Sequence, residues 1–361
     1  MRYYMPTRLY QEEHCVAAHA AELAALGRHA LIVTGKHSSR ANGSLDDVIG
    51  VLRAHEIGYT VFDAVEENPS VETVMQARAL GSADMTDFVI GIGGGSPIDA
   101  AKAAAVMIAS PAADWKLLYE TKPVRALPVA AIPTTCGTGS EVTGVAVLTR
   151  HDLGTKVSMT HRVFPALALV DGRYLLTAPQ QMLVNTAADA LSHLIETIIN
   201  SGADAYSDML AFTGLSAWAQ CRSVLEGKTP LDDALAHQLM HASTLAGMSI
   251  AQTGTSIPHA LSYLLTTQGG VPHGAAVGAF QANFLRLADP ERRNAVLHAA
   301  GFPDTAALAD WMQTYVPVCV DAALVKRSAD AVLQNSAKLK TCPYPIGTSV
   351  MAELISGVAA S

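Results

Sequence analysis

Apolar residues in the first half of the chain form short continuous runs separated by longer amphipathic stretches. The runs at 30–34, 60–65, 87–92 and 127–132 predict buried strands, since they are short and end at glycine, proline or acidic residues. Helical spacing of apolar positions predicts helices at 11–26, 44–55, 70–80 and 97–108. Strands that are apolar on both faces and alternate with helices are typical of a parallel sheet covered on both sides.

The pattern changes after residue 176. Helical patterns at 179–199, 203–225, 231–250 and 258–265 follow one another through short links, and strand signals are few. The sequence therefore predicts an α/β domain at 1–178 and an all-α helical domain at 179–361. A cleft between two such domains is the usual place for a small-molecule site.

Composition excludes several classes of protein. The chain has 361 residues and a net charge of −8, with no basic run, so we expect no nucleic-acid partner. No apolar run reaches the roughly 18–20 residues of a membrane span, so we expect no membrane partner. The five cysteines are scattered without CxxC spacing, which favours free thiols in a cytoplasmic protein.

Glycines follow the third apolar run directly. Gly93, Gly94, Gly95 and Ser96 lead from that strand into a helix opened by Pro97. Glycine lets a backbone approach a phosphate closely, and a helix start supplies free N–H groups. A plain strand-to-helix turn is the alternative interpretation.

A second loop follows the next strand and favours the phosphate interpretation. Residues 133–141 are rich in hydroxyls and glycines, among them Thr134, Thr135 and Thr138. A solvated turn is the alternative, but such a turn has little need for several hydroxyls between apolar flanks. Two such loops at the ends of neighbouring strands indicate a nucleotide site.

Four residues of the second half indicate a metal site. Asp189 and His193 stand four residues apart in a helical pattern, so both side chains leave one helix face. His259 and His273 bracket a short segment further on. One carboxylate and three imidazoles suit a first-row divalent metal. Each residue also has a simpler interpretation: Asp189 as a capping partner, and each histidine as an ordinary core or surface residue.

These motifs together resemble those of the iron-containing (group III) alcohol dehydrogenases, over essentially the whole chain. The segments 87–102 and 132–143 resemble the two cofactor loops of that family, and the four residues above match its metal ligands. The segments 4–7, 33–47 and 66–69 resemble the short 1,3-propanediol and butanol dehydrogenase-like members.

The resemblance implies a fold, an activity and a set of cofactor contacts. The fold would be a Rossmann-like parallel-sheet domain followed by an all-α helical domain, in a dehydroquinate synthase-like architecture. The activity would be NAD(P)-dependent interconversion of a primary alcohol or diol and its aldehyde, with Fe²⁺ bound; Zn²⁺ or Ni²⁺ could replace iron as isolated. The expected cofactor contacts are Gly35, Ser38, Ser39, Asn68, Gly93, Gly94, Gly95, Ser96, Asp99, Thr134, Thr135, Thr138, Thr143 and Lys156.

One position departs from the family pattern. Many relatives have a second histidine four residues after the ligand that matches His259, and this chain has Tyr263 there. A phenol with an ordinary pKa near ~10 is a poor base at neutral pH. We therefore expect protons to move through water, the cofactor ribose or the Tyr263 hydroxyl. Tyr263 and the ligand His273 are the candidate catalytic residues.

The stretch after the first strand bears on cofactor choice. Residues 35–40 contain no acid, and they include Lys36 and Arg40. An acid at this point of a Rossmann-like site selects NAD, because it meets the ribose 2′-hydroxyl. The lack of an acid in residues 35–40 predicts that NADP(H) is preferred and NAD(H) possible. Two solvated surface cations are the alternative.

Other functions remain open on the same scaffold. These are a reductase of a hydroxy- or phosphono-aldehyde, a lyase that uses the cofactor transiently, and a non-catalytic nucleotide-binding protein. We also expect a homodimer or a larger homo-oligomer, as is common among the relatives.

Overall fold

The computed structural model describes residue 1 and residues 3–358, and its centre is a sheet of six parallel strands. The strands are β1 (Arg8–Gln11), β2 (His29–Thr34), β3 (Gly58–Phe62), β4 (Phe88–Gly93), β5 (Val129–Pro133) and β8 (Leu167–Val170). Their order across the sheet is β1-β8-β5-β4-β2-β3. A separate antiparallel hairpin consists of β6 (Val147–Arg150) and β7 (Thr155–Ser158).

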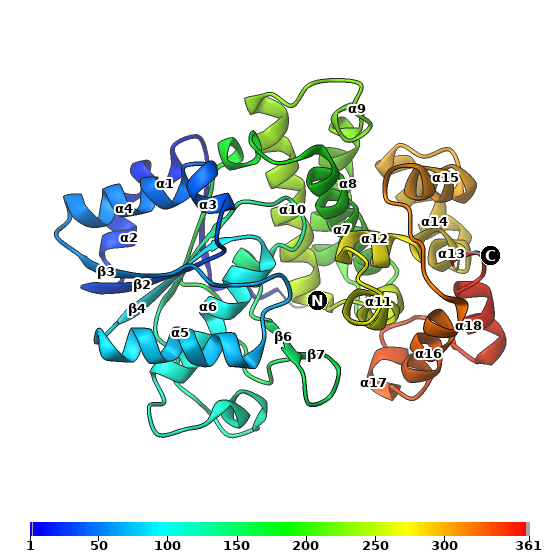
Figure 1. Ribbon diagram of the computed structural model, residues 1–361. Helices are drawn as coiled ribbons and strands as arrows, with labels where there is room; N and C mark the ends of the chain where they lie inside the picture. Colours follow the sequence, from blue (N-terminus) through cyan, green and yellow to red (C-terminus); the bar gives the residue numbers. More distant parts are fainter. Residues whose placement is uncertain (2, 359–361) are drawn as a thin grey trace.

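Alternate residues of the central strands face two different helical layers. In β2, Leu31 and Val33 pack with α5 (Val71–Ala83) and α6 (Gly95–Ile108). Their neighbours Ala30 and Ile32 pack with α1 (Cys15–Ala18), α2 (Ala20–Ala24) and α4 (Ser44–Ala54) on the opposite face. Figure 1 shows α5 on one side of the sheet and α1 and α4 on the other. The predicted parallel sheet with both faces covered is confirmed.

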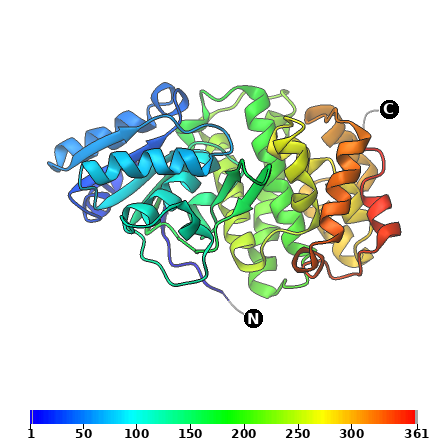
Figure 2. The ribbon, with the colours of Figure 1, turned by 60° about the horizontal axis from the view of Figure 1, so that its bottom comes forward.

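The second half is helical, as predicted. Its helices are α7 (Gln180–Ile198), α8 (Ala205–Gln220), α9 (Arg222–Leu225), α10 (Asp233–Thr253), α11 (Ile257–Thr267), α12 (His273–Gly278), α13 (Gln281–Arg286), α14 (Pro290–Ala300), α15 (Thr305–Tyr315), α16 (Ala322–Leu333), α17 (Ser336–Leu339) and α18 (Thr348–Leu354). Figure 2 shows this helical half beside the sheet half from a second direction. The exact division at 178/179 stays a prediction.

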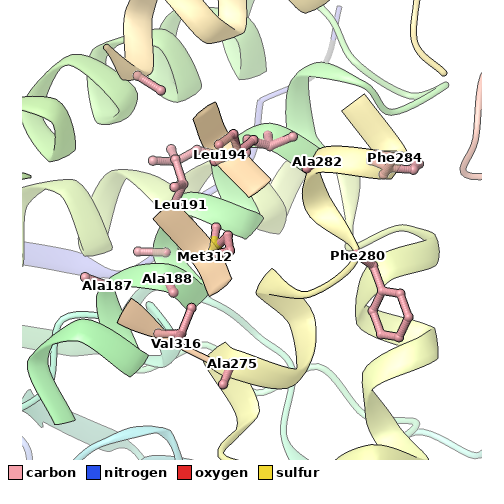
Figure 3. Packing of buried hydrophobic residues seen from close by; sticks show 14 of the residues in the cluster. Ala187, Ala188, Leu191, Leu194, Ala275, Phe280, Ala282, Phe284, Met312 and Val316 are labelled. Carbon is pink, nitrogen blue, oxygen red and sulfur yellow. The ribbon is translucent and has the colours of Figure 1, made fainter. Parts of the chain in front are cut away.

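A buried helix, α7, organises the helical half. Leu191 and Leu194 of α7 lie in one apolar cluster with Ala275 of α12 and Met312 of α15 (Figure 3). Trp218 of α8 donates its indole N–H to the Ala187 carbonyl of α7 at 2.8 Å. Because α7 is packed from several sides, polar groups on its inner face are held in fixed positions.

The predicted helix at 11–26 is wrong at its start. Residues 8–11 form the edge strand β1, and two short helices, α1 and α2, follow with a break at His19. The run 203–225 is likewise two helices that meet at Cys221. Short elements of this kind gain their stability from tertiary pairing, here of β1 with β8, which apolar spacing alone does not reveal.

Within the described residues, no helix is both long enough and apolar enough to cross a membrane. The same part of the chain contains no disulfide, because all five cysteines are unpaired.

Candidate metal and cofactor site

Three helices bring the four predicted ligand residues together. Asp189 and His193 lie one turn apart on α7, and only 3% and 5% of their surfaces are exposed. His259 lies in the first turn of α11, just after Pro258, a residue that fits the start of a helix. His273 is the first residue of α12, and its side chain is 26% exposed.

The three imidazoles point at one carboxylate oxygen. Asp189 Oδ1 lies 3.8 Å from His193 Nε2, 3.4 Å from His259 Nε2 and 3.7 Å from His273 Nε2. The rings of His193 and His259 are stacked with centroids 4.4 Å apart, and His273 stands edge-on to His259. The ligand atoms of Asp189, His193 and His259 all lie within 4.8 Å of one another, and His273 approaches the same carboxylate oxygen from the side of α12.

The hydrogen bonds of this cluster fit a metal ion. His193 Nδ1 lies 3.3 Å from the Gly137 carbonyl and His259 Nδ1 lies 2.6 Å from Glu196 Oε1, so both protons belong on Nδ1. In its neutral form each ring then has its lone pair on Nε2. Asp189 Oδ1 and His259 Nε2 are buried without a hydrogen-bond partner among the described residues. Buried polar atoms without partners are costly, and a cation would satisfy them.

The charge states also suit a cation. Burial opposes ionisation of Asp189, but His193 and His273 outweigh it and lower the pKa of that carboxyl. Burial lowers the pKa of both His193 and His273. At neutral pH the cluster therefore offers a carboxylate and two neutral imidazoles, which are the forms that bind metals. Despite burial, Glu196 and Asp189 raise the pKa of His259 to about 9, so a metal ion bound there would displace a proton from that ring.

Glycine allows α12 to approach α7. A Cβ on Gly274 would stand 1.7 Å from the carbonyl oxygen of Asn185 on α7. In the same way, a Cβ on Gly137 would stand 2.7 Å from the Thr186 carbonyl. These two close contacts bring His273 and the loop after β5 against the helix that carries Asp189.

The two predicted cofactor loops are adjacent. Gly93 has a φ of +143°, where a side chain is strained. A Cβ on Gly94 would lie 3.0 Å from the Thr135 hydroxyl, and one on Gly95 would lie 2.8 Å from Thr138 Cγ2. Thus the N-terminus of α6 and the hydroxyls of the second loop border one surface. Thr134, also in that loop, is buried.

Asn68 connects two other predicted residues, Ser96 and Lys156. Its backbone N–H donates to Ser96 Oγ at 3.1 Å, and its Oδ1 accepts from Lys156 Nζ at 3.0 Å. Lys156 Nζ lies 5.8 Å from the ring centroid of Tyr263. Burial lowers the pKa of Lys156 to about 8 and raises that of Tyr263 to about 12. Lys156 and Tyr263 therefore link the glycine turn to the helix that carries His259.

Asp99 and Thr143 belong to a buried polar cluster around Lys102. Asp99 Oδ1 accepts from Ser140 Oγ at 2.5 Å and lies 3.5 Å from Lys102 Nζ. Lys102 has no exposed surface; it donates to Ser140 Oγ at 2.7 Å and lies 3.5 Å from the Thr143 hydroxyl. This cluster holds the second loop against α6.

Ser39, predicted as a cofactor contact, lies in the short helix α3 (Ser38–Ala41) that follows β2. Ser39 is completely buried and accepts a hydrogen bond from Thr34 Oγ1 at 2.8 Å, so it supports the turn from inside. Ser38 is exposed and Gly35 partly exposed, as a cofactor contact requires. Arg40 is paired with Asp63 at 3.0 Å.

Comparison with known proteins agrees with this geometry. Residues 6–172 match the family described as iron-containing alcohol dehydrogenase, and residues 183–307 match the C-terminal region of the same family. The chain belongs to the iron-containing alcohol dehydrogenases.

Known alcohol dehydrogenases of this kind are similar to the chain in sequence and in fold. The iron-containing alcohol dehydrogenase of Thermotoga maritima superposes with a TM-score of 0.90 at 35% identity, covering 98% of both chains. An NADPH-dependent butanol dehydrogenase of Clostridium saccharobutylicum is 31% identical over 69% of this chain and 65% of its own length. An aldehyde-alcohol dehydrogenase of Entamoeba histolytica is 30% identical over 78% of this chain but only 33% of its own length. The matches thus span less than two thirds of these two curated relatives.

Glu196 and Lys102 are two residues whose importance the sequence did not reveal. Glu196 lies three residues after His193 in an apolar helix. A charged residue at a buried position was the one feature of the sequence that could have indicated its importance. Its partner His259 is 63 residues away in the sequence, so only the fold brings the two together.

Proposed function

We propose that the protein is a metal-dependent NAD(P)(H) alcohol dehydrogenase or aldehyde reductase acting on a primary alcohol or diol and its aldehyde. The observation that carries this proposal is the convergence of three imidazole Nε2 atoms on Asp189 Oδ1, at 3.4–3.8 Å. The Gly137 carbonyl, which contacts His193, belongs to the loop that borders the glycine turn. Metal and nicotinamide would therefore be neighbours.

Asp189, His193, His259 and His273 would hold the metal. A divalent ion in this position would supply Lewis acidity toward the substrate oxygen, and the nicotinamide would supply or accept the hydride. Nitrogen and oxygen donors without sulfur suit Fe²⁺, and Zn²⁺ or Ni²⁺ can occupy the same set. His273, the most exposed of the four side chains, would border the substrate position.

Tyr263 would act as a hydrogen-bond donor and not as a base. Burial raises the pKa of its phenol to about 12, so the hydroxyl stays protonated at neutral pH. Lys156, held by Asn68 at 3.0 Å, would contact the cofactor with its remaining N–H groups. Proton exchange with solvent would then run through water, the cofactor ribose or the Tyr263 hydroxyl.

For the cofactor, NADP(H) would be preferred. Support comes from residues 35–40, which contain Lys36 and Arg40 and no acid. Asp63 pairs with Arg40, so this carboxylate is the group that could oppose a 2′-phosphate. A KM for NADPH well below that for NADH is expected, and Arg40→Ala should narrow the difference. A lower KM for NADH in the unaltered protein would contradict the preference.

The protein would also act as a homodimer or larger homo-oligomer in the cytoplasm. Exposed aromatic and sulfur side chains support self-association: Tyr3, Tyr4, Tyr206 and Met209 are 44–59% exposed. Five unpaired cysteines suit a reducing compartment. Sedimentation equilibrium would measure the assembly, and a single monomeric species at micromolar concentration would contradict it.

Turnover on a panel of substrates tests the main proposal. Metal-free protein, reloaded with Fe²⁺ or Zn²⁺, would be assayed with primary aldehydes, diols and phosphono-aldehydes while NADPH and NADH absorbance is followed. We expect aldehyde-dependent oxidation of NADPH that requires the metal, and loss of it in Asp189→Asn. Binding of metal and cofactor without net oxidation by any aldehyde would instead favour the lyase or the non-catalytic alternative.

A further inference from the structure

Glu196 is a buried carboxylate that does not face the candidate metal position directly. It lies on α7 seven residues after Asp189, and none of its surface is exposed. A charge in such surroundings costs free energy unless it is hydrogen-bonded on several sides. Its burial in the apolar centre of the helical half therefore requires groups that stabilise the charge.

Three donors from α13 and the start of α11 hold this carboxylate. Its Oε1 accepts from His259 Nδ1 of α11 at 2.6 Å and from Gln281 Nε2 of α13 at 2.8 Å. Its Oε2 accepts from the backbone N–H of Ser256, just before α11, at 2.5 Å. Because both oxygens are engaged, the plane of the carboxylate is fixed.

The contact with His259 decides where that imidazole carries its proton. A carboxylate oxygen at 2.6 Å requires an N–H on Nδ1, so the lone pair of the neutral ring lies on Nε2. That Nε2 stands 3.4 Å from Asp189 Oδ1, the shortest of the three approaches. Glu196 thus also sets the rotation of the ring.

The other two imidazoles lack a comparable partner. His193 Nδ1 faces the neutral carbonyl of Gly137 at 3.3 Å. His273 Nδ1 is buried with no hydrogen-bond partner in the part of the chain that the structure describes. A charged acceptor binds an N–H more strongly than a neutral one, so His259 is the most firmly oriented of the three.

We infer that Glu196 is a positioning residue: its carboxylate holds His259 in the tautomer and orientation that direct Nε2 at the metal, and so sets the metal affinity of the site. The inference rests on the proposed metal dependence. Carboxylates that orient ligand histidines commonly change metal affinity by about 10–100-fold when they are altered.

Metal titration of the metal-free protein tests this role without any turnover. Co²⁺ is the probe, because its visible absorption reports the ligand geometry. Glu196→Gln keeps the shape but places an amide N–H₂ among the three donors, so at least one contact must break. We expect a Kd for Co²⁺ about 10–100-fold above that of the unaltered protein, and an altered absorption spectrum.

A matched control separates positioning from loss of buried charge. Asp171→Asn neutralises another carboxylate with no exposed surface, which bonds to Cys15 N–H and Arg173 away from the cluster. We expect it to bind Co²⁺ like the unaltered protein. NADPH binding to metal-free Glu196→Gln, followed by fluorescence, should match the unaltered protein and so report an intact fold.

The outcomes are distinguishable. If Glu196→Gln binds Co²⁺ within threefold of the unaltered protein with the same spectrum, the role of Glu196 is refuted while the proposed function stands. If the unaltered protein binds no divalent metal, the proposed function itself fails. Should Glu196→Gln not fold, Gln281→Leu removes one donor to the carboxylate; it should also raise the Kd, and an unchanged Kd overturns the inference.

Discussion

The contact between Gly274 and α7 provides a quantitative test of the candidate metal site. In Gly274→Ala the new methyl carbon would stand 1.7 Å from the Asn185 carbonyl oxygen, whereas real Cβ atoms stay at least 3.0 Å away. The start of α12 must therefore retreat by about 1.3 Å, the difference between those two distances. His273 is the preceding residue and moves with it.

Such a movement exceeds what a metal site tolerates. Ligand distances vary by only about 0.2 Å around their preferred values, so a shift more than five times larger removes His273 from coordination. We expect the Kd for Co²⁺ or Zn²⁺ to rise by about 100-fold, at the upper limit seen when a ligand is misoriented. The free energy of unfolding should fall by about 1–3 kcal/mol, as in other overpacked sites.

Isothermal titration of metal-free protein measures the first effect, and urea unfolding measures the second. Gly50→Ala is the matched control, since the same methyl group at this exposed position of α4 would meet nothing within 4 Å. It should leave metal binding unchanged and stabilise the fold by about 0.5–1 kcal/mol. If Gly274→Ala bound metal as tightly as the unaltered protein, His273 would not be a required ligand.

Three further outcomes are expected. Tyr263→Phe should lower turnover but keep the same pH profile between pH 6 and 9, because the phenol donates a hydrogen bond and, with its pKa raised to about 12, is protonated throughout that range. Undiminished turnover would remove Tyr263 from the proton route, and loss of the basic limb of the profile would contradict its role as a donor. Burial lowers the pKa of Lys156 to about 8, so its ammonium loses its charge as the pH rises through about 8, and the affinity for NADPH should weaken over the same range. Lys156→Gln should abolish this pH dependence, which a fluorescence titration with NADPH would measure. Lys102→Met leaves Asp99 without its cation and should destabilise the fold by about 3 kcal/mol in urea unfolding, a value near zero being the contrary result.

The central sheet could be predicted because its strands are apolar on both faces. The runs at β2, β4 and β5 are continuous, and each ends near a glycine or a threonine-rich loop. By contrast β1, β8 and each strand of the β6–β7 hairpin are only four residues long. Elements of that length carry little periodic signal, and their pairing partners are distant in sequence.

The candidate site could be predicted only in part from local spacing. Asp189 and His193 are related by one helical turn, and that relation is visible in the sequence. His259 and His273 could be named as candidate ligands, but only the resemblance to a family joined them to Asp189 and His193, because no local spacing relates them to α7. Glu196 could not be found in this way, since its contacts with Ser256 and Gln281 exist only once α11 and α13 pack against α7.

The loop after β5 and helix α10 touch backbone to backbone. A Cβ on Gly139 would lie 2.3 Å from Gly247 Cα, and one on Gly247 would lie 2.6 Å from Gly139 Cα. Apart from the Val142 side chain, the atoms in contact with these two glycines belong to the backbone, so a shift of the loop along α10 would bring backbone atoms into collision. We therefore expect any opening that admits or releases a dinucleotide to rotate about this glycine pair and not to slide across it.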